Sequence, residues 1–177
     1  MAPKYINKLS DQIVINQKCI RNGKVYLSDA KYHTPGKKCK DSSVLLNGDI
    51  LINSTGTGTL GRAGIWFAPY EKTYFVDTHV TRLFLKNGGD LSGFLVEYFN
   101  TEFFQKQLYS ECVSGSTNQI ELNKNQLSEL KVPTLEGQQL KDVLELLSIL
   151  DSTICAIDEK LLSIILLKKN IQQKYWG

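Results

Sequence analysis

The sequence has no long hydrophobic segment. No run of about eighteen apolar residues, the length that a membrane-spanning helix needs, occurs in the 177 residues. The first residues also lack the apolar core of a secretory signal. We therefore expect a cytoplasmic protein that does not contact membranes.

Cysteine and histidine are scarce. The four cysteines, at positions 19, 39, 112 and 155, form no C-x-x-C pair, and the histidines are His33 and His79 alone. Neither histidine stands at zinc-ligand spacing from a cysteine. This pattern predicts reduced thiols and no metal site.

Catalytic signatures are also absent. The sequence has no N-P-P-Y or D-P-P-Y motif and no glycine turn that leads into a helix, so we expect no S-adenosylmethionine site. No carboxylate pair of the nuclease type occurs, and neither histidine has an identifiable serine or cysteine partner. We predict no catalytic residues and no cofactor bound by this chain.

Positive charge is concentrated near the N-terminus. The chain has a net charge of +3, but residues 1–40 contain nine lysines and arginines against Asp11 and Asp29. A basic segment is typical of a phosphate-binding face, although a solvated surface explains the charge equally well. The candidate phosphate contacts are Lys18, Arg21, Lys24, Lys37, Lys38 and Lys40.

Residues 12–86 show mainly strand patterns, whereas helical spacing begins near Asp90. Asp90 is a candidate N-cap, and Asn100 is a candidate break in the helix that follows. A polar loop is predicted at 114–119 and a short helix at 123–130. The predicted strands are 12–15, 24–27, 49–53, 64–67, 73–76 and 80–86.

Residues 136–173 contain no helix breaker after Gly137. Apolar residues recur there with three-four spacing over about five heptads, which is typical of a coiled coil. Such a helix is about 55 Å long; a core helix of a compact domain is the alternative. The predicted dimerisation residues are Leu140, Val143, Leu147, Leu150, Ile154, Ile157, Leu161, Ile164 and Ile171.

The apolar surface of this helix is wider than one seam. Lys168 is the polar exception on the seam, where a single charged residue can fix the register at a cost in stability. Further apolar residues would remain in water against one partner helix: Leu144, Leu146, Leu162, Ile165, Leu166 and Leu167.

The predicted fold class is α+β. A β-rich domain with short helices covers residues 1–134, and a long coiled-coil helix covers residues 135–177.

A glycine motif lies between the predicted strands 49–53 and 64–67. Residues 56–61 fit G-x-G-x-x-G but lead into a strand rather than a helix, which argues against a nucleotide-binding site. A polar hairpin tip that approaches another surface closely fits better, with a simple tight turn as the alternative. The candidate contacts are Asn53, Ser54, Thr55, Thr57 and Arg62 on this tip, and Ser116, Thr117, Asn118 and Gln119 on the second polar loop.

The order of these features resembles the specificity subunits of type I restriction-modification systems. Residues 47–52 (NGDILI), the glycine-rich tip and residues 60–62 (LGR) are similar to one core segment of that family. Residues 115–117 (GST) and 130–133 (LKVP) are similar to a second. Residues 136–138 (EGQ) depart by one residue from the Glu-Gln pair that usually opens the family's long helix.

The resemblance implies a non-catalytic subunit that recognises DNA. Such subunits usually carry two recognition domains, held apart by two antiparallel helices, and each domain recognises half of a split target. They bind adenine methyltransferase subunits and, through them, the restriction subunit. S-adenosylmethionine, ATP and Mg would be bound only by those partners.

This chain resembles half of such a subunit. We therefore expect a homodimer through the long helix, bound to double-stranded DNA by the basic and polar candidates above. Two other functions stay open. A decoy would bind the methyltransferase subunit without recognising DNA, and a nucleotide-binding enzyme would depend on the glycine motif alone.

Overall fold

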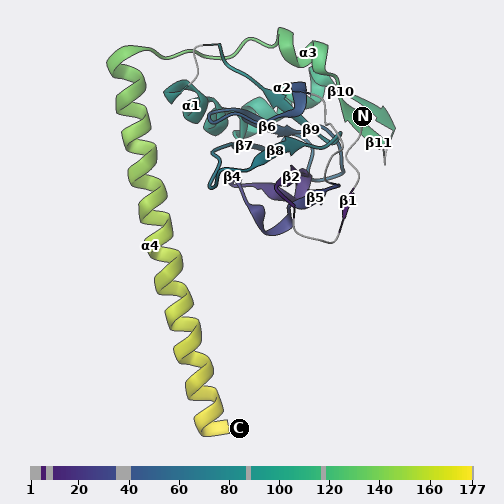
Figure 1. Ribbon diagram of the computed structural model, residues 1–177. Coiled ribbons are helices and arrows are strands. Elements are labelled where there is room, and N and C mark those ends of the chain that lie inside the picture. Colours follow the sequence, from purple (N-terminus) through teal and green to yellow (C-terminus); the bar gives the residue numbers. More distant parts are fainter. Residues whose placement is uncertain (1–4, 7–9, 35–40, 87–88, 117–118, 177) are drawn as a thin grey trace. The chain divides into compact units, whose positions relative to one another are not determined.

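The chain divides into two compact units in the computed structural model (Figure 1), Met1–Thr134 and Leu135–Gly177. The structure describes residues 5–6, 10–34, 41–86, 89–116 and 119–176. Among these residues, the first unit contains three sheets and short helices, and the second contains one long helix. The predicted α+β class is confirmed.

The largest sheet of the described residues has five strands in the order β3-β4-β7-β6-β9. β6 pairs antiparallel with both β7 and β9, whereas β4 pairs parallel with β7. The strands are β3 (Ile20–Arg21), β4 (Gly23–Val25), β6 (Ile50–Asn53), β7 (Ala63–Ile65) and β9 (Val80–Leu83).

A second sheet of the described residues has the order β1-β5-β2-β8. β2 pairs parallel with β8 and antiparallel with β5. The strands are β1 (Tyr5–Ile6), β2 (Gln12–Ile15), β5 (Lys31–His33) and β8 (Thr73–Val76). Three short 3₁₀ helices are described in the first unit: η1 (Gln17–Cys19), η2 (Leu27–Asp29) and η3 (Asp41–Ser43).

β6 contributes to both hydrophobic clusters of the described residues. All of its residues are buried. Because successive side chains of a strand point to opposite faces, Ile50 and Ile52 pack with Phe104 in one cluster, while Leu51 packs with Trp66 in the other. The rings of Trp66 and Tyr74 lie 4.7 Å apart between centroids.

Apolar side chains from the helices of the first unit pack into the hydrophobic cluster that contains Ile50. These helices are α1 (Asp90–Phe99), α2 (Glu102–Cys112) and α3 (Lys124–Glu129). The N-cap of α1 is Gly89 rather than the predicted Asp90, whose carboxylate instead lies in the first turn, where the helix dipole favours negative charge. The predicted break at Asn100 is confirmed, since α1 ends there and Thr101 caps α2.

The predicted polar loop at 114–119 is wrong. A hairpin forms there from β10 (Val113–Ser116) and β11 (Gln119–Leu122), in antiparallel register. Gly115 allows the close pairing, because a Cβ at its φ of 122° would collide with the backbone oxygen of Gln119. The serines and glycine of β10 lack the apolar alternation that would have indicated a strand.

Some predicted strands are shorter than expected. β9 ends at Leu83 rather than at residue 86, because Leu83 pairs with Ile50, where its neighbour β6 begins. The run at 24–27 ends at Val25, and Leu27 starts η2. β6 begins at Ile50 rather than at Asp49, and β7 covers Ala63–Ile65 rather than residues 64–67.

The second unit consists of α4 (Gly137–Trp176), a helix of 40 residues. At about 1.5 Å per residue it is about 60 Å long. None of its described residues is buried, and its own unit contains no other element that encloses it. Seam residues such as Leu150 and Ile157 are 59% and 58% exposed. No described helix has the length and apolarity to cross a membrane.

A buried ion pair anchors the start of β6. Asp49 is 1% exposed, and its carboxylate pairs with the guanidinium of Arg82 on β9, with Arg82 Nη2 3.2 Å from Asp49 Oδ1. The same carboxylate accepts the backbone N–H of Leu46 at 2.7 Å. Removing one partner of such a pair leaves the other charge uncompensated.

We predict that Asp49→Ala lowers the free energy of unfolding by about 3 kcal/mol, because it leaves the buried charge of Arg82 without its partner carboxylate. Urea denaturation followed by circular dichroism measures the change. Lys106→Ala is the control: Lys106 pairs with Glu102 at 2.7 Å, but both side chains are mostly exposed, so the loss should be small. Equal effects of the two substitutions would contradict the anchoring role of Asp49.

Candidate nucleic-acid interface

The glycine motif forms an ordered loop between β6 and β7, residues 54–62, which we call the tip loop. The backbone N–H of Gly61 donates to Asn53 O at 2.9 Å, and that of Asn53 donates to Arg62 O at 3.0 Å. Thr57 and Gly58 are exposed. The predicted hairpin is thus confirmed, with its hydroxyl-bearing end in solvent.

Helix α2 holds one side of the tip loop. The side-chain amide of Gln105 donates to Gly61 O at 2.9 Å, and the Tyr109 hydroxyl donates to Leu60 O at 3.3 Å. Gly61 has a φ of 84°, and a Cβ there would collide with the Gln105 side chain and lie 2.9 Å from Leu108 Cδ2. The conformation therefore favours glycine at this position, and an added Cβ would displace the Gln105 and Leu108 side chains.

Two of the predicted tip contacts face the interior. Asn53 is fully buried, and its side-chain amide donates to Gln17 O at 3.0 Å. Ser54 is 2% exposed, and its hydroxyl bonds to that of Thr81. Because both side chains are enclosed by η1 and β9, we withdraw Asn53 and Ser54 from the set that faces a partner.

Thr55 links the tip loop to the β10–β11 hairpin. It forms an antiparallel bridge with Glu121, and the N–H of Leu122 donates to Ser54 O at 2.8 Å. A cavity of about 250 Å³ lies at this junction and is lined by Thr55, Gly56, Gln119, Ile120 and Glu121. The two polar segments singled out in the sequence therefore form one surface.

His79 belongs to the same surface. Its Nδ1 lies 3.0 Å from the Thr55 hydroxyl, and its backbone oxygen accepts the N–H of Ser54 at 2.8 Å. His79 is not among the contact residues predicted from the sequence. The pairing of Asn53 with Val80 in antiparallel strands brings residue 79 beside residue 54, and the sequence does not specify that pairing.

A polar cluster around the buried Asp77 supports His79. The N–H of His79 donates to Asp77 Oδ1 at 2.9 Å, and the Tyr5 hydroxyl donates to Asp77 Oδ2 at 3.2 Å. Burial raises the pKa of Asp77, and burial together with the Asp77 charge raises the pKa of Tyr5 to about 12. Burial also raises the pKa of the Cys19 thiol to about 11, so Cys19 is not an activated nucleophile.

A hollow of about 590 Å³ lies on the other side of the tip loop. Two of the predicted arginines meet there: Arg62, whose Nη2 donates to Gly58 O at 2.7 Å, and Arg21 at the end of β3. The parallel pairing of β4 with β7 brings these distant segments together. The lining residues are Arg21, Asn22, Gly23, Arg62, Glu97 and Asn100.

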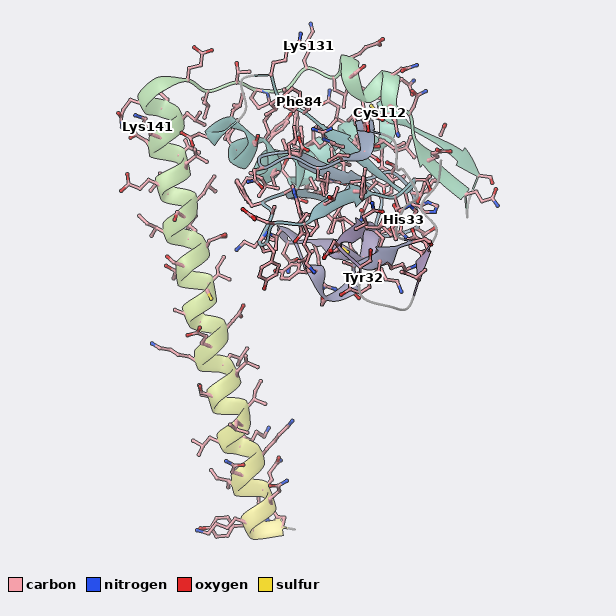
Figure 2. The ribbon with its side chains drawn as sticks, in the orientation of Figure 1. Tyr32, His33, Phe84, Cys112, Lys131 and Lys141 are labelled. Carbon is pink, nitrogen blue, oxygen red and sulfur yellow. The ribbon has the colours of Figure 1, made fainter. Side chains whose placement is uncertain are left out.

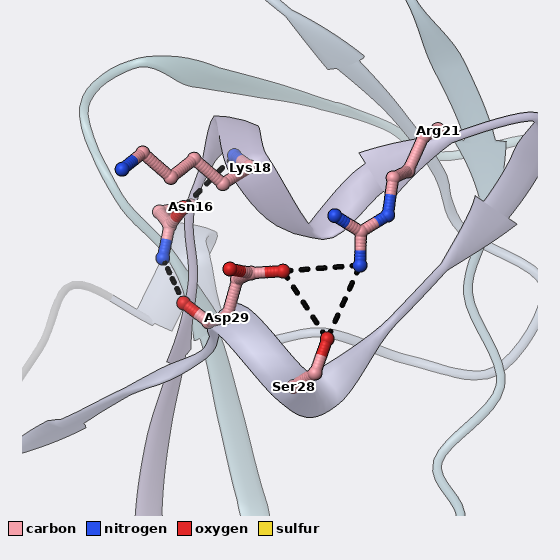
Figure 3. A network of polar contacts seen from close by, with 5 residues as sticks. All are labelled: Asn16, Lys18, Arg21, Ser28 and Asp29. Atoms are coloured by element: carbon pink, nitrogen blue, oxygen red, sulfur yellow. Dashed lines mark hydrogen bonds and ion pairs between the residues drawn. The ribbon is translucent and has the colours of Figure 1, made fainter. Parts of the chain in front are cut away.

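Figure 3 shows how Arg21 is oriented. Its Nη2 lies 3.0 Å from Asp29 Oδ2 and 3.1 Å from Ser28 Oγ. The guanidinium carbon lies 4.9 Å from the centroid of the Tyr26 ring. Asp29 offsets part of the charge of Arg21, and these contacts hold the guanidinium while leaving it partly exposed.

The remaining predicted contacts are scattered. Lys18 and Lys24 are exposed, on η1 and β4, and Ser116 pairs with Gln119 in the exposed β10–β11 hairpin. The side chains of the described residues show no group of three or more histidines, cysteines or carboxylates that could hold a metal ion. Lys37, Lys38, Lys40, Thr117 and Asn118 lie outside the described residues.

We predict that Gly61→Ala destabilises the fold more than Gly58→Ala. Both glycines have positive φ, so each substitution costs about 1–2 kcal/mol of backbone strain. Only Gly61 also faces a collision with α2, whereas Gly58 has open space around its Cβ position. Thermal denaturation of the two variants measures the difference, and equal losses would show that α2 does not hold the tip loop.

Comparison with known proteins identifies the family. A family model described as the type I restriction modification DNA specificity domain matches residues 14–166, which include the tip loop, the hairpin and most of α4. No curated protein matches the chain. Because the match covers most of the sequence, the chain belongs to the type I restriction modification DNA specificity domain family, whose members recognise DNA sequence.

Proposed function

We propose that this chain is a half subunit, which recognises one half of a split DNA target and pairs with a second copy through α4. The observation that carries the proposal is the apolar seam of α4. It runs the length of the helix, and the unit that contains α4 has no other element to cover it. Exposed apolar surface of this extent is characteristic of an interaction site.

The DNA-contacting surface in this proposal is the tip loop with its two neighbouring cavities. Arg21 and Arg62 offer guanidinium groups, which bind phosphates and guanine edges in a bidentate manner. Thr57 and Gln119 offer exposed polar groups of the kind that contact base edges and phosphates. The imidazole of His79 adds a further polar group beside Thr55.

Pairing of two copies gives the assembly a two-fold axis. Each copy carries one recognition domain, so the dimer presents two identical domains related by that axis. Identical domains in this relation match a palindrome interrupted by a spacer, whose length depends on the helices. The proposal therefore predicts the symmetry of the target but not its bases.

The second apolar set on α4 suggests how the catalytic subunits bind. Leu162 and Leu166 are 66% and 61% exposed and lie outside the seam. Methyltransferase subunits that cover this outer surface would place their active sites on the DNA beside the recognised half-sites. S-adenosylmethionine, and the ATP and Mg used by a restriction subunit, would then be bound by those partners.

We predict that Ile154→Asp combined with Ile157→Asp converts the dimer into a monomer, because it places carboxylates in the middle of the apolar seam. Analytical ultracentrifugation at micromolar concentration measures the change. Ser152→Asp combined with Ser163→Asp is the control, since it adds the same two charges to exposed residues away from the seam. An unmodified protein that stays monomeric at this concentration would overturn the homodimer.

We predict that Arg62→Ala weakens binding to the target DNA about tenfold, within the range for loss of one bidentate contact. Lys106→Ala, on the exposed face of α2, should leave binding unchanged. Fluorescence anisotropy at fixed salt gives both affinities. If Arg62→Ala has no effect, the hollow is not part of the DNA surface.

Coexpression with the methyltransferase subunit tests the whole proposal. Mapping of adenine methylation across a genome should return one interrupted palindrome. Relaxed specificity at one base pair in the Arg62→Ala variant would indicate a base contact, and a uniform decrease would indicate a phosphate contact. Binding to the methyltransferase subunit without target-dependent methylation would instead support a decoy.

A further inference from the structure

We infer one particular register for the antiparallel pairing of two α4 helices that the family resemblance implies, with its centre between Cys155 and Ala156. The inference deepens the proposed homodimer and depends on it. It depends on the positions of charged and apolar residues along α4 (Figure 2). The unit that contains α4 has no other element that covers the exposed side chains of this helix.

Charge is distributed unevenly along α4. Its first half, residues 137–154, carries three carboxylates against one lysine, and residues 157–176 carry four lysines against two carboxylates. Two parallel copies would bring like charges together at both ends. Antiparallel copies bring the acidic half of one helix beside the basic half of the other, which favours this orientation.

Lys168 favours the same orientation. It lies on the seam, so parallel helices would place the Lys168 ammonium group of one copy against that of the other between the helices. Like charges that lose water in this way are strongly unfavourable. In the antiparallel register proposed, Lys168 lies opposite Val143 of the partner copy, so the two ammonium groups are far apart.

The seam alone allows several antiparallel registers, which differ by shifts of seven residues. The register centred between Cys155 and Ala156 leaves none of the ten seam positions from Leu140 to Ile171 without a partner. Its opposed pairs are Leu140 with Ile171, Val143 with Lys168, Leu147 with Ile164, Leu150 with Leu161, and Ile154 with Ile157.

The residues beside the seam select this register from the others. In an antiparallel coiled coil, each position that flanks the seam faces the equivalent flanking position of the partner helix. In this register Leu144 therefore faces Ile165, and Leu146 faces Leu167. Of these side chains, Leu146 is 61% exposed in the single chain and Leu167 is 60% exposed, so the pairing covers surface that is otherwise in water.

Shifts of one heptad remove both flanking pairs. A shift in one direction places Leu144 opposite Gln172 and Leu146 opposite Lys174. A shift in the other direction places them opposite Asp158 and Lys160. Each alternative therefore sets a leucine against a polar or charged side chain. The proposed register does bring Asp151 near Asp158 of the partner copy, at the exposed edge where water and salt screen the repulsion.

Disulfide crosslinking of full-length protein tests the register. In a background with Cys39→Ser and Cys155→Ser, the described cysteines that remain, Cys19 and Cys112, are buried. Val143→Cys and Lys168→Cys variants with different affinity tags are mixed and oxidised. We expect a crosslink between the two variants and none between copies of the same variant, because a disulfide needs Cα atoms within about 7 Å.

The matched control is Leu150→Cys mixed with Lys168→Cys. These positions come together only after a shift of one heptad, which is about 10 Å along the helix, so this mixture should not crosslink. Crosslinks of Val143→Cys to itself would show parallel helices, and crosslinks in the control mixture would show a different register. Either result overturns the register while the homodimer stands, whereas a monomer before oxidation overturns the homodimer itself.

Discussion

The burial of β6 on both faces is the constraint on which the first unit depends. Its isoleucines pack against the helices and its leucine packs against the aromatic cluster of the other side, so the strand cannot shift by one residue without exposing both clusters. The Asp49–Arg82 pair holds one end of the strand, and Asn53 and Ser54 hold the other. The tip loop begins at that second end and is therefore placed by the core.

This arrangement separates support from recognition. The polar groups nearest the core, such as Ser54 and Thr81, bond to one another and keep the loop in one conformation. The groups one or more residues further out, such as Thr57 and Arg62, are exposed. In the proposed interface these exposed groups contact DNA, and the supported loop gives them the rigid frame that precise contacts require.

The second unit meets a different constraint. A single helix of 40 residues cannot bury its own apolar surface, whatever its propensity, since helices in water gain most of their stability from packing. In the proposed dimer, one antiparallel arrangement of two copies satisfies the seam, the flanking leucines and the uneven charge of α4 together. In that proposal the paired helices set the distance between two recognition domains, as a split target requires.

The sequence by itself determined the features that depend on short-range periodicity. The α+β class, the hairpin around the glycine motif and the length of α4 follow from spacings of two, three and four residues, which can be counted directly. Tertiary structure alone decided which polar residues face outward. Asn53 and Ser54 are covered by segments far away in the chain, His79 reaches Thr55 through the pairing of β6 with β9, and Arg21 meets Arg62 through the pairing of β4 with β7. Strand pairing between distant segments depends on how whole surfaces are buried, and no local pattern encodes it.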